Sequence, residues 1–242
     1  MNFKILYLLC FAFVGSAFGQ IPDDETNTVA YHKILYGGLG VANTGFNGHL
    51  RYGKHITAKR KRLYEIEFTT LRSTREVRQS ASPSARNYVF GKQNYAYLMR
   101  IGIGEQRVLT YKPLGNGVEV KTITSFGLSN SFLKPVYYLI AFFGDNFALE
   151  ERFNPDFHSP VNTIGETSFF NGFSEMIYQP GIYGKFALNF EYSAEKTGIK
   201  SVETGVVLDA FAKPIEIMAF DNKQNLFVSF YVALQFGQKY YR

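Results

Sequence analysis

Apolar and polar residues alternate with a period of two along most of the chain. In the stretch 226–236 every second residue is apolar, and Ser229, Tyr231, Ala233 and Gln235 occupy positions between them. This alternation is typical of a β-strand whose two faces meet different environments. The pattern predicts an all-β protein with eight strands. They are expected at about 29–40, 46–52, 62–71, 95–104, 118–128, 177–192, 202–209 and 226–236.

The two faces of these strands differ in chemistry. One face is apolar and aromatic with almost no charge, whereas the other mixes Gly, Ser and Asn with charges of both signs. A soluble lipocalin-like barrel would turn the apolar face inward, and an outer-membrane barrel would turn it toward lipid. The alternation alone fits both arrangements.

Three features favour the membrane arrangement. Small residues recur on the polar face, where an eight-stranded barrel has a narrow interior. Acids and bases share that face, so they can pair across the lumen. Tyr and Phe stand near the ends of the apolar faces, as interfacial girdles require. The girdle candidates are Tyr52, Tyr64, Tyr95, Tyr192 and Phe236. We therefore predict a closed, antiparallel, up-and-down transmembrane β-barrel of about eight strands.

This fold assigns the charges of the polar face to the lumen. An unpaired buried charge is costly, so opposite charges are expected to pair inside a space just wide enough for its own side chains. We therefore expect a plugged lumen, with a narrow solute pore as the alternative. The predicted lumen network is Arg51, Glu65, Glu67, Arg100, Glu119, Lys121, Lys185, Glu191, Glu203 and Asp209. The predicted lipid-facing residues of the closing strand are Leu226, Val228, Phe230, Val232, Leu234 and Phe236.

The connections between strands predict two unlike ends. With both ends of the chain in the periplasm, three connections are periplasmic turns and four are extracellular loops, and the longest connections fall outside. The expected turns are at about 56–61, 105–117 and 193–199. The expected loops are at about 41–45, 72–94, 141–176 and 212–225. The length and aromatic content of loop 141–176 suggest a packed or partner-bound loop.

The first residues predict export. Lys4 precedes an unbroken apolar run, and small residues follow as far as Gly19, which is the order of a secretory signal peptide. We expect cleavage after residue 19 and a mature domain of residues 20–242, which lacks Cys10 and therefore any disulfide or thiolate metal site. The net charge of +6 falls to +5 without Lys4, too mild to indicate a nucleic-acid partner. The basic run 59–62 is interpreted as a solvated turn.

Candidate chemistry is sparse. A Ser-His-acid arrangement requires a base within hydrogen-bond reach of the nucleophile, and the sharpest candidate is His158-Ser159, with Asp156 and Glu166 nearby. Adjacent residues on a strand point to opposite faces, so these two are poorly placed to pair. We predict no catalytic residues, no cofactor and no metal site. An outer-membrane enzyme that acts on lipid A remains the alternative.

Four segments carry a resemblance to a known family. "LRYGKH", "FLKPVYYLI", "YQPGIYGKFALNFEY" and the closing "VALQFGQKYYR" resemble small outer-membrane β-barrels of Bacteroidota, the OmpA-like and PorT-like group, without the OmpA C-terminal domain. The resemblance implies an architecture in the Gram-negative outer membrane rather than an activity. We expect a structural or accessory subunit of an outer-membrane assembly, secretion or surface-lipoprotein complex. Its expected partners are outer-membrane lipids, lipopolysaccharide and, through loop 141–176, other surface proteins.

Overall fold

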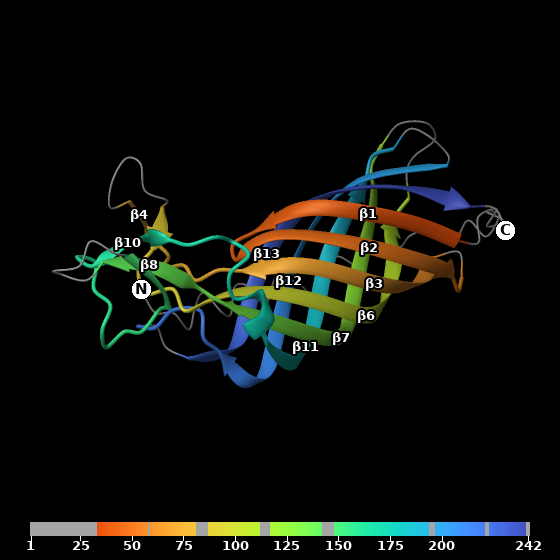
Figure 1. Ribbon diagram of the computed structural model, residues 1–242. Helices are drawn as coiled ribbons and strands as arrows, with labels where there is room; N and C mark the ends of the chain where they lie inside the picture. The colour runs from red at the N-terminus through yellow and green to blue at the C-terminus, as the bar shows by residue number, and fades with distance from the viewer. Residues whose placement is uncertain are drawn as a thin grey trace, which may run out of the picture.

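Eight long antiparallel strands close into a barrel in the computed structural model (Figure 1). The structure describes residues 33–57, 59–80, 87–111, 117–141, 148–193, 197–220 and 223–240. The barrel strands are β1 (Lys33–Ala42), β2 (Gly45–His55), β3 (Arg60–Leu71), β6 (Asn94–Thr110), β7 (Glu119–Pro135), β11 (Ile177–Glu191), β12 (Gly198–Ile215) and β13 (Gln224–Tyr240). Each pairs with its neighbours in sequence, and β13 pairs with β1 to close the barrel. The predicted fold class is confirmed.

The short strands outside the barrel gather beyond one rim, which we call the loop end (Figure 1). There β8 (Tyr137–Ala141) pairs with β9 (Ala148–Arg152) and β10 (Thr163–Glu166). The remaining short elements are β4 (Arg78–Gln79), β5 (Tyr88–Val89) and the 3₁₀ turn η1 (Phe173–Glu175). At the opposite rim, the turn end, the strands are joined by the connections 56–59, 111–118 and 192–197.

The outward face of the closing strand β13 forms an apolar stripe. The side chains of Leu226, Val228, Phe230, Val232, Leu234 and Phe236 are between 41% and 60% exposed. The ten residue steps from Leu226 to Phe236 cover about 33 Å along the strand. A strand tilt of about 40° reduces this to about 25 Å along the barrel axis, the height of the apolar band of a transmembrane barrel.

Several strands are longer than the alternation predicted. β6 continues through the first part of the predicted turn 105–117, because Gln106 and Val108 still point into the barrel and are buried. Likewise β12 continues to Ile215, which pairs with Gln224, so the predicted loop 212–225 is shorter than expected. The predicted signal peptide lies outside the described residues. Among the residues that the structure describes, no helix is long and apolar enough to cross a membrane.

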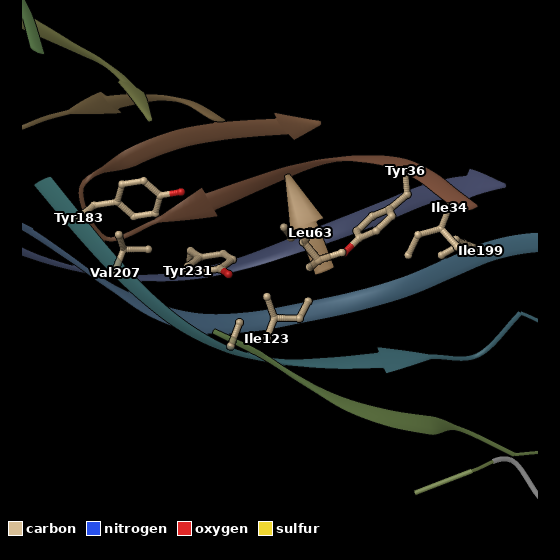
Figure 2. Close-up of a cluster of buried hydrophobic side chains, with 10 residues drawn as sticks. Ile34, Tyr36, Leu63, Ile123, Tyr183, Ile199, Val207 and Tyr231 are labelled. Carbon is tan, nitrogen blue, oxygen red and sulfur yellow. The ribbon is translucent and has the colours of Figure 1, made fainter. Parts of the chain in front are cut away.

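The barrel interior contains both charged and apolar side chains. The buried inward residues of β3 show the order from the turn end to the loop end: Lys61, Leu63, Glu65, Glu67, Thr69 and Leu71. Leu63 belongs to an apolar cluster in which Tyr36, Ile123 and Tyr231 converge from separate strands (Figure 2). Leu71 belongs to a second apolar cluster beneath the loop end, with Ala96, Leu98, Leu133, Phe211, Ile215 and Ile217. Along β3 the carboxylates of Glu65 and Glu67 therefore lie between members of two apolar clusters. Tyr183 and Tyr231 of the first cluster lie beside the carboxylates, since their hydroxyls donate to Glu65 and Glu203.

Candidate functional site

Arg51 forms the first part of an ionic network inside the barrel. Its Nε lies 2.5 Å from a carboxylate oxygen of Glu65. Its two terminal nitrogens contact both carboxylate oxygens of Glu203, at 2.5 Å and 2.8 Å. Tyr231 and Gln235 also donate to Glu203, each at a distance of 2.5 Å. The Arg51 guanidinium is fully buried, and its partners come from two strands, β3 and β12.

Arg100 and Lys185 extend the network toward the loop end. Arg100 donates to both oxygens of Asp209, at 2.9 Å and 2.6 Å, and to Glu67 at 2.5 Å. Lys185 bridges Glu67 and Glu65, with its Nζ 3.0 Å from the latter. Three cations and four carboxylates thus form one continuous chain across five strands. Because each charge has an opposite partner at contact distance, the network satisfies the strict pairing that burial demands.

A second, smaller charged group lies at the turn end of the lumen. Glu191 is paired with Lys121 and Lys239, and Lys121 also lies 3.5 Å from Glu119. Lys61 points into the same region and is buried. The interpretation of the run 59–62 as a solvated turn is wrong for this residue, since the alternation of β3 turns Lys61 inward between its outward neighbours.

The ten predicted lumen residues therefore fall into two groups. Seven belong to the central network, and Glu119, Lys121 and Glu191 belong to the turn-end group. A cavity of about 10 Å³, lined in part by Lys61, Lys121 and Glu191, lies beside the turn-end group. This is about the space that one water molecule occupies.

The loops at the loop end pack into a small structured body, which we call the loop cap (87–93, 136–141, 148–166 and 216–220). Its buried core consists of Tyr88, Val136, Tyr138, Ile140 and Phe153. The Tyr138 hydroxyl donates to the carbonyls of Val89 (2.7 Å) and Lys92 (3.0 Å), and burial raises the pKa of this phenol well above its usual range. The cap is therefore an ordered part of the molecule with its own hydrophobic core.

Backbone hydrogen bonds tie the loops of the cap together. The backbone amide of Gln93 donates to the carbonyl of Ile217 at 2.9 Å, and the backbone amide of Ala219 donates to the carbonyl of Gly91 at 2.8 Å. Val136 in turn donates to the carbonyl of Gln93 over 2.9 Å. The connections after β3, β7 and β12 are thus joined to one another above the apolar cluster that contains Leu71.

The candidate catalytic residues are not brought together. The ring of His158 accepts a hydrogen bond from the backbone amide of Asn154 at 3.1 Å, and its other nitrogen faces the carboxylate of Glu151 at 3.3 Å. Glu166 accepts a hydrogen bond from the hydroxyl of Tyr95. Neither ring nitrogen is directed to Ser159, which is exposed to solvent. Among the described residues, no three His, Cys, Asp or Glu side chains gather as metal ligands.

The loop end also contains a feature that the strand pattern did not predict. Tyr95, predicted as a girdle residue, does face outward from β6, but its hydroxyl donates to Glu166 over 2.8 Å and its ring stacks on Tyr97. Its register partner Lys134 also faces outward, yet its side chain is almost completely covered. The segment 167–175 covers this part of the wall.

Comparison with known proteins gives structural neighbours only. No family model matches the chain, and no curated protein matches it. Neisserial surface protein A has a similar structure, with 9% identity and a TM-score of 0.45 over 87% of this chain and 97% of that one. A major outer membrane protein from Thermus thermophilus has 10% identity and a TM-score of 0.44 over 86% and 99%.

A third similar structure is Ail, the attachment invasion locus protein of Yersinia pestis, in complex with the heparin analogue sucrose octasulfate. It has 8% identity and a TM-score of 0.40 over 87% of this chain and 97% of that one. These similarities assign no activity to the chain.

Proposed function

We propose that the chain is an integral barrel of the Gram-negative outer membrane, closed to solutes, that serves as a structural or accessory subunit of an envelope complex. The observation that carries the proposal is the ionic network of Arg51, Arg100 and Lys185, which fills the lumen together with apolar side chains and has a packed cap beyond it. The assignment to the OmpA-like and PorT-like barrels of Bacteroidota stays a prediction.

The membrane location is supported by the outer surface of the barrel. Outward residues on other strands repeat the apolar stripe of β13, for example Leu39, Leu50, Phe68 and Phe126, and all are exposed. Such a continuous apolar surface on a monomer marks an interface with lipid or protein. The predicted signal peptide supports export to the envelope.

A closed lumen is supported by how the interior is filled. Conduction requires a water-filled path, whereas an eight-stranded barrel has an interior that its own side chains can fill. Here the charged side chains pair with one another across the lumen, and two clusters of apolar side chains pack beside them and toward both ends of the barrel. A solute would have to break buried ion pairs to pass, so a pore is disfavoured.

The accessory role is supported by the cap. Its core residues make it an ordered platform, and Leu149, Phe157 and Val161 leave apolar side chains exposed on it. Exposed loops held by a rigid scaffold commonly carry binding function. The enzyme alternative has less support, because both ring nitrogens of His158 have other neighbours.

Deletion of the β8–β10 part of the cap tests the accessory role. Tyr138 and Glu166 are register partners in neighbouring strands, so replacement of residues 139–165 by Asn-Gly would join them through a two-residue turn. The wild type and this variant would be purified from native outer membranes in mild detergent. We expect stoichiometric companions with the wild type that are lost from the variant while its barrel remains heat-modifiable. Companions that remain with the variant would assign binding elsewhere, and a wild type without companions would contradict the accessory role.

A further inference from the structure

The segment 167–175 lies against the outer wall of the barrel rather than within the cap. In Figure 1 the chain leaves β10, runs beside the barrel strands and reaches η1 before it enters β11. Lys134 of β7 lies beneath it and is 2% exposed although it faces outward. Its ammonium donates to the carbonyls of Phe169 (2.8 Å) and Asn171 (2.9 Å).

Aromatic rings complete the cover of this ammonium. Its Nζ lies 5.0 Å from the ring centroid of Phe169, 5.3 Å from that of Phe173 and 5.4 Å from that of Tyr95. These distances are within the range of cation–π attraction. Lys134 therefore holds the segment on the wall through the carbonyls of Phe169 and Asn171 and the rings of Phe169 and Phe173, while Tyr95 is the third ring and belongs to the wall itself.

Further contacts fix the turn of the segment. Gly172 has a φ of +86°, and a Cβ at this position would lie 2.8 Å from the carbonyl oxygen of Pro135 on β7. The Tyr137 hydroxyl donates to Glu175 at 2.6 Å, and the side-chain amide of Asn171 donates to Glu150 at 2.7 Å. The segment is thus held in one place, and the carboxylate of Glu175 is bonded to Tyr137.

Three phenylalanines project from this fixed segment, and we call them the aromatic wedge (Phe169, Phe170 and Phe173). Their rings pack edge-on or tilted, with centroids 5.4 to 6.3 Å apart. Phe170 is 78% exposed, and the other two are also classed among the exposed side chains. The burial of apolar surface stabilises a protein, so three adjacent exposed rings on a rigid support call for an apolar environment.

The position of the wedge indicates which environment this is. Phe132 is two residues before Lys134 on the same outward face, about 7 Å along the strand. Its ring packs against Tyr178 of β11, with centroids 5.6 Å apart, where the apolar stripe of the wall reaches the loop end. Tyr and Phe at this level form the interfacial girdle of transmembrane barrels. Because the wedge covers Lys134, it lies next to this lipid-facing part of the wall.

We propose that the aromatic wedge inserts into the lipid leaflet at the loop end, at the boundary between headgroups and acyl chains, and so anchors the long loop to the membrane. This inference rests on the proposed membrane location of the barrel. It assigns loop 141–176 two roles: residues up to 166 form the cap, and residues 167–175 contact lipid.

Depth-dependent fluorescence quenching tests the wedge. The chain contains no tryptophan, so a single introduced tryptophan is the sole indole reporter. Phe170→Trp reports on the wedge, and Val161→Trp, 79% exposed in the native protein, is the matched position on the cap. Phe230→Trp, in the middle of the β13 stripe, reports on membrane insertion itself. Each folded variant would be reconstituted into phosphatidylcholine vesicles with bromine atoms near the carbonyl end or near the methyl end of the acyl chains.

We expect Phe170→Trp to lose emission with bromine near the carbonyl end, Phe230→Trp to lose emission most with bromine near the methyl end, and Val161→Trp to keep its emission. If Phe170→Trp keeps its emission in both lipids while Phe230→Trp is quenched, the wedge proposal fails and the membrane barrel stands. If Phe230→Trp is not quenched either, the membrane location itself fails. The heat-modifiable mobility of each variant verifies that its barrel is folded.

Discussion

Arg51 of β2 and Glu203 of β12 face each other across the barrel lumen as a bidentate pair, although 152 positions separate them in the sequence. The two strands do not pair with each other, since β1 and β13 lie between them on the barrel wall. The contact therefore links separate parts of the wall through the interior. It makes the lumen part of the core that holds the closed barrel together.

Replacement of Arg51 by Met is expected to destabilise the barrel strongly. It leaves the carboxylates of Glu65 and Glu203 buried without their guanidinium, and the loss of one partner from a buried ion pair typically costs about 3–5 kcal/mol. Urea unfolding in lipid vesicles, followed by circular dichroism, measures the change in free energy of unfolding. Addition of Glu203→Gln is expected to recover part of the loss, because it removes the carboxylate that loses its ion-pair partner, whereas Glu65 still contacts Lys185.

Arg60→Met is the matched control for this prediction. Arg60 pairs with Glu105 at 3.5 Å on the surface, where both side chains are nearly half exposed. Exposed pairs contribute about 0–1 kcal/mol, so this variant is expected to remain close to the wild type. Equal effects of Arg51→Met and Arg60→Met would mean that the lumen network does not stabilise the fold.

Gly172→Ala is expected to loosen the segment 167–175. A residue with a Cβ in the left-handed region costs about 1–2 kcal/mol, and here the Cβ would also approach Pro135. Hydrogen exchange measured by mass spectrometry is expected to accelerate about tenfold in this segment. Gly184→Ala is the control, because a Cβ at this position has no neighbour within 4 Å. Unchanged exchange in Gly172→Ala would show that the segment is not held in this turn.

The cap is expected to open at alkaline pH through Tyr138. Burial raises the pKa of its phenol above the usual value of about 10, so the stability that the neutral phenol contributes is complete below about pH 10 and is lost as the pH rises further. Burial also lowers the pKa of Lys92. Its effect on the stability of the cap becomes more favourable as the pH rises, so it opposes the loss of stability that ionisation of Tyr138 causes. Comparison of cap opening in the wild type and in Tyr138→Phe isolates the contribution of the phenol to the pH dependence.

A single thiol measures this opening, because the only cysteine of the chain lies in the predicted signal peptide. Ile140→Cys places a thiol in the cap core, and Val161→Cys places one on its exposed surface. The ratio of their labelling rates is expected to rise above about pH 10, and to rise less when Tyr138→Phe is present. A ratio that stays constant with pH would contradict the role of Tyr138.

Ser159→Ala is expected to leave the lipid A of the cell unchanged. The ring nitrogens of His158 face Asn154 and Glu151, so Ser159 lacks the adjacent base that nucleophilic catalysis requires. Mass spectra of lipid A from cells with the wild type, Ser159→Ala and the control Ser168→Ala measure this directly. A modified lipid A species that disappears in Ser159→Ala alone would restore the enzyme alternative.

The sequence predicts what depends on the alternation of neighbouring residues. The two faces of β13, the number of barrel strands and the inward direction of Arg51 and Glu203 all follow from a period of two. The strand ends are predicted less accurately, since Gln106 and Val108 continue the alternation of β6 in a stretch where turn residues were expected.

The sequence could not predict contacts that depend on the closed barrel. The choice of Glu203 as the partner of Arg51 depends on which strands face each other across the lumen. The burial of Lys134 depends on a loop that returns to the outer wall 35 residues later. The outward position of Lys134 beside an apolar strand end nevertheless indicates such a cover, because an exposed ammonium next to lipid requires a partner.

Planar-bilayer recording distinguishes a membrane barrel with a closed lumen from a narrow pore. The purified wild type would be reconstituted at high protein density, with a general porin as the positive control for insertion and quenching of Phe230→Trp as the measure of insertion for this chain. We expect insertion without stepwise conductance, because paired charges and apolar side chains fill the lumen. Reproducible steps of uniform conductance from the inserted protein would contradict a closed lumen.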